Sequence, residues 1–225
     1  MPTADSAPRT VPKNKIQIPK LRFSTTIFQF GNGDSVGSLG EKDDEMRFRE
    51  TRVVGAQLIA PSPHQDERGR FFRAWCSREF TEHGIEFLPV QANMGFSVHK
   101  GTIRGMHLQR SPAPEAKLIR CTRGRMFDVV LDLRPDSPSY GKWHGEELSA
   151  ENGCMLYVPE LCAHGYQTLD DNTEMYYMTS QFYTPSAASG VRFNDPAFAI
   201  EWPLAATVVS EQDRNWPLTK DRSWM

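Results

Sequence analysis

The sequence predicts an all-β domain in which many short antiparallel strands form a sandwich or a barrel. Between residues 51 and 183, short runs rich in aliphatic, aromatic and β-branched residues alternate with turn signals, a spacing typical of such folds. One stretch, SREFTEHG (77–84), has a helical pattern, with Ser77 as the expected cap and Glu79 behind it. A few short helices are therefore expected beside the strands.

Seven runs are expected to contain strands. They are TRVVGAQLIAP (51–61), GRFFRAW (69–75), FLPVQANMGF (87–96), AKLIRCTRGRMFDVVLDL (116–133), GCMLYVPE (153–160), AHGYQTL (163–169) and EMYYMTSQFY (174–183). A further β-like stretch, GTIRGMHLQR (101–110), sets an arginine and a histidine three residues apart around a glycine. The sequence shows no internal repeat.

The run 116–133 is long enough for two strands and a turn. If Arg123 and Gly124 form a two-residue turn, Lys117 and Asp128 become diagonal neighbours on one face, about 7–8 Å apart. That face also carries Ile119, Cys121, Met126 and Val130, and the other face carries Leu118, Phe127, Val129 and Leu131. With both faces apolar, the hairpin belongs inside a barrel or sandwich, where a Lys–Asp pair is either a structural salt bridge or part of a site.

Two glycine-anchored segments, GTIRGMHLQ (101–109) and GCMLYVPELCAHG (153–165), favour a cupin-type jelly roll. A metal-binding cupin needs several imidazole and carboxylate ligands around one ion. Gln109 stands where a second histidine would be needed, which leaves His107 and His164 without a third convincing ligand. The predicted fold is an antiparallel jelly-roll (cupin-like) β-barrel, and no metal site is expected.

Composition narrows the function classes. The 26 basic and 28 acidic residues nearly balance, so neither a nucleic-acid nor an anionic-membrane surface is expected. The apolar runs are shorter than a membrane span, and the first twenty residues lack the apolar stretch of a secretory signal, so we expect a cytoplasmic protein. The cysteines are scattered and are expected to be free thiols: Cys76, Cys121, Cys154 and Cys162.

Residues 1–45 are expected to form a flexible N-terminal extension. The first fourteen are rich in Pro, Ser, Ala and charge. KIQIPKLRFSTTIFQF (15–30) alternates enough to form a strand, and GNGDSVGSLGEKDDE (31–45) has the composition of a flexible linker. The compact domain is expected over residues 46–225.

Most of the domain, from about Met46 to Asp213, carries motifs that resemble those of a known family. These motifs, in order, are DERGRFF (66–72), PVQAN (89–93), KGTIRGMHLQ (100–109), AKLIRCTRGRMFDVVLDLR (116–134), DSPSYGKW (136–143), VPELCAHGYQTL (158–169) and VRFNDPAFAIEWP (191–203). They resemble the nucleotide-sugar epimerase family of dTDP-4-dehydrorhamnose 3,5-epimerase. The resemblance implies a jelly-roll homodimer without metal or cofactor, whose substrate is a nucleotide sugar.

The reaction that the resemblance implies is inversion of ring carbons next to the ketone of a 4-keto-6-deoxy sugar nucleotide. Such a reaction needs a base, a cation to hold the enolate oxygen, and an acid on the opposite face of the ring. By resemblance, His107 is the base, Lys117 the cation and Tyr177 the acid. Asp213, in VVSEQD (208–213), is expected to hold the second ring nitrogen of His107.

The resemblance also implies a set of substrate-binding residues: Arg104, Arg68, Gln91, Asn93, Asp128, His164 and Tyr183. Arg104 is expected to be a second cation, and Tyr183 to stack on the nucleotide base. Residues three apart on a straight strand face opposite ways. For Arg104 and His107 to share a pocket, either Gly105 must kink the strand or Arg104 must lie at its start. Tyr176 should face away from Tyr177, into the core.

Two departures from the family pattern leave the substrate open. Arg73 stands where a glutamate is common, and Leu161 and Cys162 stand where Gly-Phe is usual. The expected activity is epimerisation at C3 and C5 in rhamnose-type deoxysugar biosynthesis. The alternatives are an epimerase acting at C3 alone, a non-catalytic sugar-nucleotide-binding cupin, and a metal-dependent cupin oxygenase.

Overall fold

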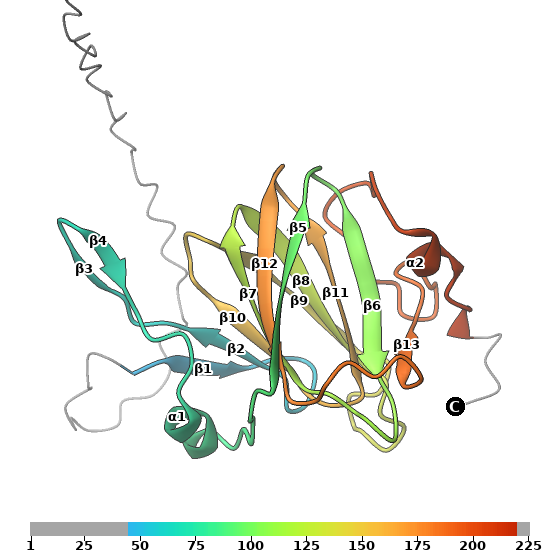
Figure 1. Cartoon of the computed structure of the whole chain (residues 1–225). Helices are drawn as coiled ribbons and strands as arrows, with labels where there is room; N and C mark the ends of the chain where they lie inside the picture. Colours follow the sequence, from blue (N-terminus) through green and yellow to red (C-terminus); the bar gives the residue numbers. More distant parts are fainter. Residues whose placement is uncertain (1–44, 220–225) are drawn as a thin grey trace, which may run out of the picture. The chain divides into compact units, whose positions relative to one another are not determined.

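The computed structural model describes residues 45–219 of the 225-residue chain. The expected N-terminal extension and its candidate strand at 15–30 lie outside the described residues. The described part is antiparallel β-structure with two short helices, α1 (Ser77–Glu82) and α2 (Glu211–Asn215) (Figure 1). The predicted fold class is therefore confirmed. In this part of the chain, no helix is long and apolar enough to cross a membrane.

Two antiparallel sheets form the body of the domain. The six-stranded sheet has the order β1 (Arg47–Glu50), β2 (Gln57–Ala60), β10 (Met155–Val158), β7 (Lys117–Arg123), β12 (Thr173–Thr179) and β5 (Gln91–Ser97). The five-stranded sheet has the order β13 (Ala188–Gly190), β6 (Ile103–Gln109), β11 (Cys162–Thr168), β8 (Arg125–Asp132) and β9 (Trp143–Ser149). A separate hairpin joins β3 (His64–Asp66) to β4 (Gly69–Phe71).

Side chains from both sheets meet in one buried cluster. Its members are Val53, Ala56, Leu58, Ile119, Cys121, Met126, Val130, Leu148, Leu156, Val158, Cys162, Tyr166 and Met175. The outer face of the six-stranded sheet is covered around α1, where Phe80 packs with Leu118 and Met155. On the outer face of the five-stranded sheet, Leu131 packs with Phe198 from the C-terminal segment. The strands β7, β8 and β10 are thus buried on both faces, which explains their near-continuous apolar sequences.

The predicted hairpin of residues 117–132 is wrong in its pairing. β7 pairs with β10 and β12, whereas β8 pairs with β9 and β11, so Gly124 joins strands of different sheets. Gly124 has φ +74°, and a Cβ there would lie 2.8 Å from Thr173 Oγ1. The glycine is needed, but for a corner between sheets instead of a hairpin turn. Lys117 and Asp128 are consequently not cross-strand neighbours.

Helix α1 starts one residue earlier than expected from its cap. Cys76 is the N-cap residue and makes no side-chain cap hydrogen bond, so Ser77 is the first helical residue and not the cap. Glu79 faces inward, where its Oε2 accepts a hydrogen bond from the backbone N–H of Met46 at 2.8 Å. This buried carboxylate ties the start of the described chain to the helix.

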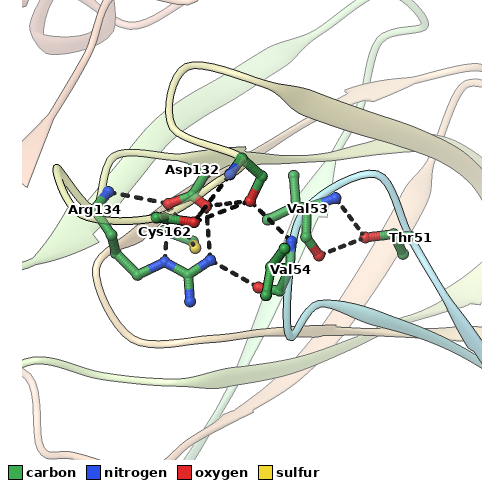
Figure 2. A network of polar contacts seen from close by, with 8 residues as sticks. Thr51, Val53, Val54, Asp132, Arg134 and Cys162 are labelled. Atoms are coloured by element: carbon green, nitrogen blue, oxygen red, sulfur yellow. Dashed lines mark hydrogen bonds and ion pairs between the residues drawn. The ribbon is translucent and has the colours of Figure 1, made fainter.

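A buried aspartate fastens the loop after β8 to the loop before β2 (Figure 2). Asp132 is fully buried, and its carboxylate accepts hydrogen bonds from the Arg134 guanidinium at 2.7 and 2.8 Å and from the Ser137 and Ser139 hydroxyls at 2.5 Å each. Arg134 also donates to the Val54 carbonyl oxygen at 2.7 Å. Burial alone would raise the pKa of Asp132, but these hydrogen bonds lower it well below its usual value.

Candidate active site

A cavity of about 740 Å³ opens between the two sheets and the segment that carries α2. Its lining is mixed, with polar side chains from both sheets. They include Asn93, Arg104, His107, Lys117, His164, Tyr166, Tyr177 and Asp213. Seven of the residues predicted from the sequence as site residues therefore line one cavity: His107, Lys117, Tyr177, Asp213, Arg104, Asn93 and His164.

Gly105 brings Arg104 and His107 to the same side of β6. Across from β6, His107 is the partner of His164 and Arg104 is the partner of Tyr166, with a register shift between the two pairs. Between these pairs, Gly105 and Met106 on β6 oppose the single residue Gly165 on β11, which defines a β-bulge. Gly105 has φ +136°, a conformation that favours glycine, and a Cβ there would lie 2.5 Å from the Gly165 Cα atom. The bulge, at the predicted glycine, lets both side chains reach one pocket.

His107 is paired with a buried carboxylate from α2. Its Nε2 lies 2.5 Å from Asp213 Oδ1, and Asp213 Oδ2 accepts the Gly105 backbone N–H at 3.3 Å. Burial would raise the pKa of Asp213, but the bond to His107 lowers it, so Asp213 is an ionised acceptor. In a neutral imidazole, Nε2 must then carry the proton and Nδ1 the free lone pair. Among the described residues, Nδ1 has no hydrogen-bond partner, so it is available as a base.

Lys117 supplies a cation beside that imidazole. Its Nζ donates to the His107 carbonyl oxygen at 3.2 Å and forms an ion pair with Glu115 Oε1 at 3.1 Å. The side chains of Lys117 and Glu115 are only 8% and 10% exposed. The partner of Lys117 is thus Glu115 and not Asp128. The sequence held a signal for this, because residues two apart on an extended chain share a face.

Tyr177 faces the cavity from the six-stranded sheet, and Tyr176 faces the other way. Tyr177 packs against the buried cluster between the sheets and lines the large cavity. Tyr176 lines a small groove of about 130 Å³ with Leu118 and Arg120. The predicted choice of Tyr177 over Tyr176 agrees with this geometry, although Tyr176 is half-buried and not in the core. Burial raises the pKa of Tyr177, and the negative charge of Glu115 raises it further, so its hydroxyl stays protonated.

His164 forms a second histidine–carboxylate pair. Its Nε2 lies 2.8 Å from Asp128 Oδ1, and Asp128 is fully buried. His164 lines the cavity, whereas Asp128 lies behind it. Asp128 Oδ2 is buried without a hydrogen-bond partner among the described residues. Asp128 therefore acts on the cavity through the orientation of His164.

Among residues 45–219, no group of three or more His, Cys, Asp and Glu side chains is arranged to hold a metal ion. Gln109, which stands where a further histidine ligand would be needed, is 2% exposed. Its amide nitrogen donates to the Ala113 and Phe182 carbonyl oxygens, and its amide oxygen accepts the Thr184 N–H at 2.6 Å. Gln109 therefore anchors loops below the site.

The chain matches known proteins over most of its length. The family model described as dTDP-4-dehydrorhamnose 3,5-epimerase matches residues 50–221. The dTDP-4-dehydrorhamnose 3,5-epimerase of Methanothermobacter thermautotrophicus is 42% identical over 175 residues, which cover 76% of this chain and 94% of that protein. The chain belongs to the dTDP-4-dehydrorhamnose 3,5-epimerase family.

Solved structures of epimerases share the fold of this family member. The crystal structure of dTDP-4-dehydrorhamnose 3,5-epimerase from Elizabethkingia anophelis has a TM-score of 0.76 and 36% identity, and covers 80% of this chain and 99% of that one. ChmJ, a 3'-monoepimerase from Streptomyces bikiniensis solved with dTDP-quinovose, has a TM-score of 0.69 and 32% identity, and covers 74% and 84% of the two chains.

In this epimerase-family chain, two further predicted residues, Gln91 and Tyr183, are linked to Asn93 by hydrogen bonds. Asn93 lines the cavity, and its Oδ1 accepts a hydrogen bond from Gln91 Nε2 at 3.1 Å. Gln91 Oε1 in turn accepts the Tyr183 backbone N–H at 3.2 Å. Tyr183 is 63% exposed, so its ring is open to a stacking partner.

Arg68 lies outside the cavity. It is on the exposed β3–β4 hairpin, where its guanidinium pairs with Asp66 and its side chain is 85% exposed. Figure 1 shows this hairpin away from the strands that surround the cavity. Within one chain, the structure does not bring Arg68 together with the other predicted substrate-binding residues.

The departures from the family pattern lie away from the reactive groups. Arg73, which stands where a glutamate is common in the family, pairs with Glu79 of α1 at 2.6 Å and does not line the cavity of its own chain. Leu161 has φ +61°, a backbone conformation that glycine adopts more easily. Cys162 is buried beside Asp132, and all four cysteines are free thiols, as predicted.

Sequence analysis missed Tyr166, which lines the cavity, and Glu115, which pairs with the lining residue Lys117. Tyr166 lines the cavity at 2% exposure, and its hydroxyl lies 3.4 Å from Ser97 Oγ. The same Ser97 Oγ accepts a hydrogen bond from Arg104 Nε at 3.2 Å. Tyr166 lies two residues after His164 in an extended run, so its shared face with His164 was readable from spacing alone.

Proposed function

We propose that the protein is a metal-independent epimerase that inverts C3 and C5 of a dTDP-4-keto-6-deoxyhexose, in rhamnose-type deoxysugar biosynthesis. The observation that carries the proposal is the meeting of a carboxylate-held imidazole, a buried ammonium and a protonated phenol in one cavity. His107 comes from the five-stranded sheet, and Lys117 and Tyr177 come from neighbouring strands of the six-stranded sheet. Family membership supports the substrate class.

The proposed chemistry balances with the groups present. His107 Nδ1 removes the proton from a carbon next to the ketone, and the electron pair of that C–H bond moves into the carbonyl to form an enolate. Lys117 and Arg104 stabilise the negative oxygen. Tyr177 then donates its phenolic proton to the carbon from the opposite face, which inverts it; the tyrosinate recovers a proton from solvent, and the His107 imidazolium releases the abstracted proton to solvent.

The test is incubation with dTDP-4-keto-6-deoxyglucose in heavy water, followed by NMR. We expect deuterium and inversion at both C3 and C5. His107→Ala should lose both solvent exchange and inversion. Tyr177→Phe keeps the ring and deletes only the hydroxyl, so exchange should continue while inversion fails at the affected carbon. Full inversion by Tyr177→Phe would contradict the assignment of the acid.

A second candidate is an epimerase that acts at C3 alone. The similarity to ChmJ, a 3'-monoepimerase, favours keeping this alternative. Deuterium at C3 without deuterium at C5 would support it, because both activities need the same base and cation. Absence of exchange at either carbon, with the nucleotide sugar still bound, would instead favour a non-catalytic binding protein.

A homodimer would explain the position of Arg68. Because the β3–β4 hairpin is exposed and Arg68 lies outside the cavity of its own chain, its predicted contact with substrate needs the hairpin of a second chain. Arg68→Ala should then raise KM more than it lowers kcat. Size-exclusion chromatography with light scattering measures the oligomeric state.

A cytoplasmic location remains a prediction, with which the four free thiols agree.

A further inference from the structure

Glu115 is a buried carboxylate that contacts Lys117 from outside the cavity lining and has no role in the proposed reaction so far. It lies two residues before Lys117, and its Oε1 is 3.1 Å from Lys117 Nζ. Both side chains are about nine-tenths buried, with 10% and 8% exposure. A buried ion pair seldom adds net stability over an apolar pair, so its presence beside the reacting groups calls for another explanation.

We propose that Glu115 is a positioning residue that aims the Lys117 ammonium at the oxygen of the substrate's ketone. This inference rests on the proposed function and adds a residue to it. A lysine ammonium has three N–H donors and a flexible four-carbon stem. The His107 carbonyl oxygen accepts one of these donors at 3.2 Å, and Glu115 Oε1 forms an ion pair with the same ammonium at 3.1 Å. These two contacts hold Nζ from two sides, and Lys117 lines the cavity, so the remaining hydrogen-bonding capacity is available to a bound substrate.

The position of Glu115 also favours the proposed role of Tyr177 as the acid. Thr179 is the cross-strand partner of Lys117, and Tyr177 is the partner of Ile119, so Tyr177 is a diagonal neighbour of Lys117 on the same face. The negative charge of Glu115 adds to burial in raising the pKa of Tyr177. One carboxylate thus holds the cation in place before the enolate forms and favours the protonated phenol that returns the proton.

The first test is Glu115→Gln, which keeps the shape of the side chain and removes its charge. We expect kcat to fall roughly 10- to 100-fold, because one oxyanion donor is misdirected and not lost. KM should change less than about threefold, since Glu115 does not touch the substrate. Exchange and inversion should fall together, because both follow enolate formation. Glu115→Asp, which restores the charge, should recover part of kcat.

Glu79→Gln is the matched control. Glu79 is also a buried glutamate in an ion pair, with a side chain 7% exposed and Arg73 at 2.6 Å, but it belongs to α1, and its partner Arg73, unlike Lys117, does not line the cavity. This variant should lose stability and keep kcat. A fall in kcat equal to that of Glu115→Gln would overturn the inference, because general destabilisation would then explain both.

A double-mutant cycle with Lys117→Met decides whether Glu115 acts through the lysine. If it does, adding Glu115→Gln to Lys117→Met should cause no further loss of the solvent-exchange rate. An equal additional loss in the double variant would overturn the inference, as would a wild-type kcat in Glu115→Gln. If the wild-type protein exchanges no deuterium at all, the proposed function fails and the role of Glu115 fails with it. If the wild type exchanges deuterium and Glu115→Gln exchanges it at the same rate, only the proposed role of Glu115 is refuted.

Discussion

Gly105→Ala tests whether the bulge in β6 creates the site. A Cβ at Gly105 would lie 2.5 Å from the Gly165 Cα atom and 3.1 Å from the His164 carbonyl oxygen. Both neighbours are backbone atoms, so β6 and β11 must separate by about 1 Å to restore an ordinary carbon–carbon contact near 3.5 Å. A misplacement of about 1 Å in a catalytic site can reduce the rate by about 10²-fold.

We therefore expect Gly105→Ala to reduce kcat about 10²-fold. The φ of +136° adds a backbone penalty of about 1–3 kcal/mol for a residue other than glycine, which lowers the free energy of unfolding. NMR of the epimerisation measures the first effect and chemical denaturation the second. The expected loss of rate arises because Arg104 and His107 no longer face the same pocket.

Gly141→Ala is the matched control for this experiment. Gly141 also has a positive φ, +73°, but a Cβ there meets nothing within 4 Å. It should lose about 1–2 kcal/mol of stability from the left-handed backbone and keep kcat. A Gly105→Ala protein with wild-type kcat, or a Gly141→Ala protein as impaired as Gly105→Ala, would refute the argument that the bulge positions the two side chains.

Three further changes have expected outcomes. Lys117→Met should reduce turnover about 10²–10³-fold, and should also lose stability because Glu115 is left unpaired; the double variant with Glu115→Gln should regain stability in thermal unfolding but not turnover. Asp132→Asn should lower the free energy of unfolding by about 3–5 kcal/mol at neutral pH; because the pKa of Asp132 is lowered by folding, this difference should shrink as the pH falls below about 4. Removal of residues 1–45 should leave a folded, active dimer, by light scattering and NMR; a monomeric or insoluble product would make 15–30 an integral strand.

The strands that could be predicted from the sequence are those whose own residues favour them. The β-branched and aliphatic runs of β7, β8 and β10 were found because both faces of these three strands are covered. β9, WHGEELS, was missed. It carries adjacent glutamates, and Gly145 at its centre lies against the Phe127 ring, where a Cβ would be 2.1 Å from Cζ. β9 is at the edge of its sheet and exists because β8 pairs with it.

The site residues divide in the same way. The family motifs predicted which side chains share the cavity, and His107, Lys117, Tyr177 and Asp213 all line it. Their partners were harder to predict. Asp128 was expected beside Lys117 but bonds to His164, because a contact between side chains depends on which sheet each strand joins. That choice is set by pairing between strands distant in the sequence.

The incorrect hairpin prediction at Gly124 shows that local sequence rules do not determine which strands pair. A two-residue turn and a corner between sheets both need a glycine with positive φ, so the local chemistry is the same. The side-chain alternation is also the same: Ile119, Cys121, Met126 and Val130 do share one buried cluster, as the hairpin predicted. They meet across the space between two sheets instead of along one ladder. Choosing between the two folds required knowing that β10 and β12 flank β7, and those strands begin more than thirty residues further along the chain.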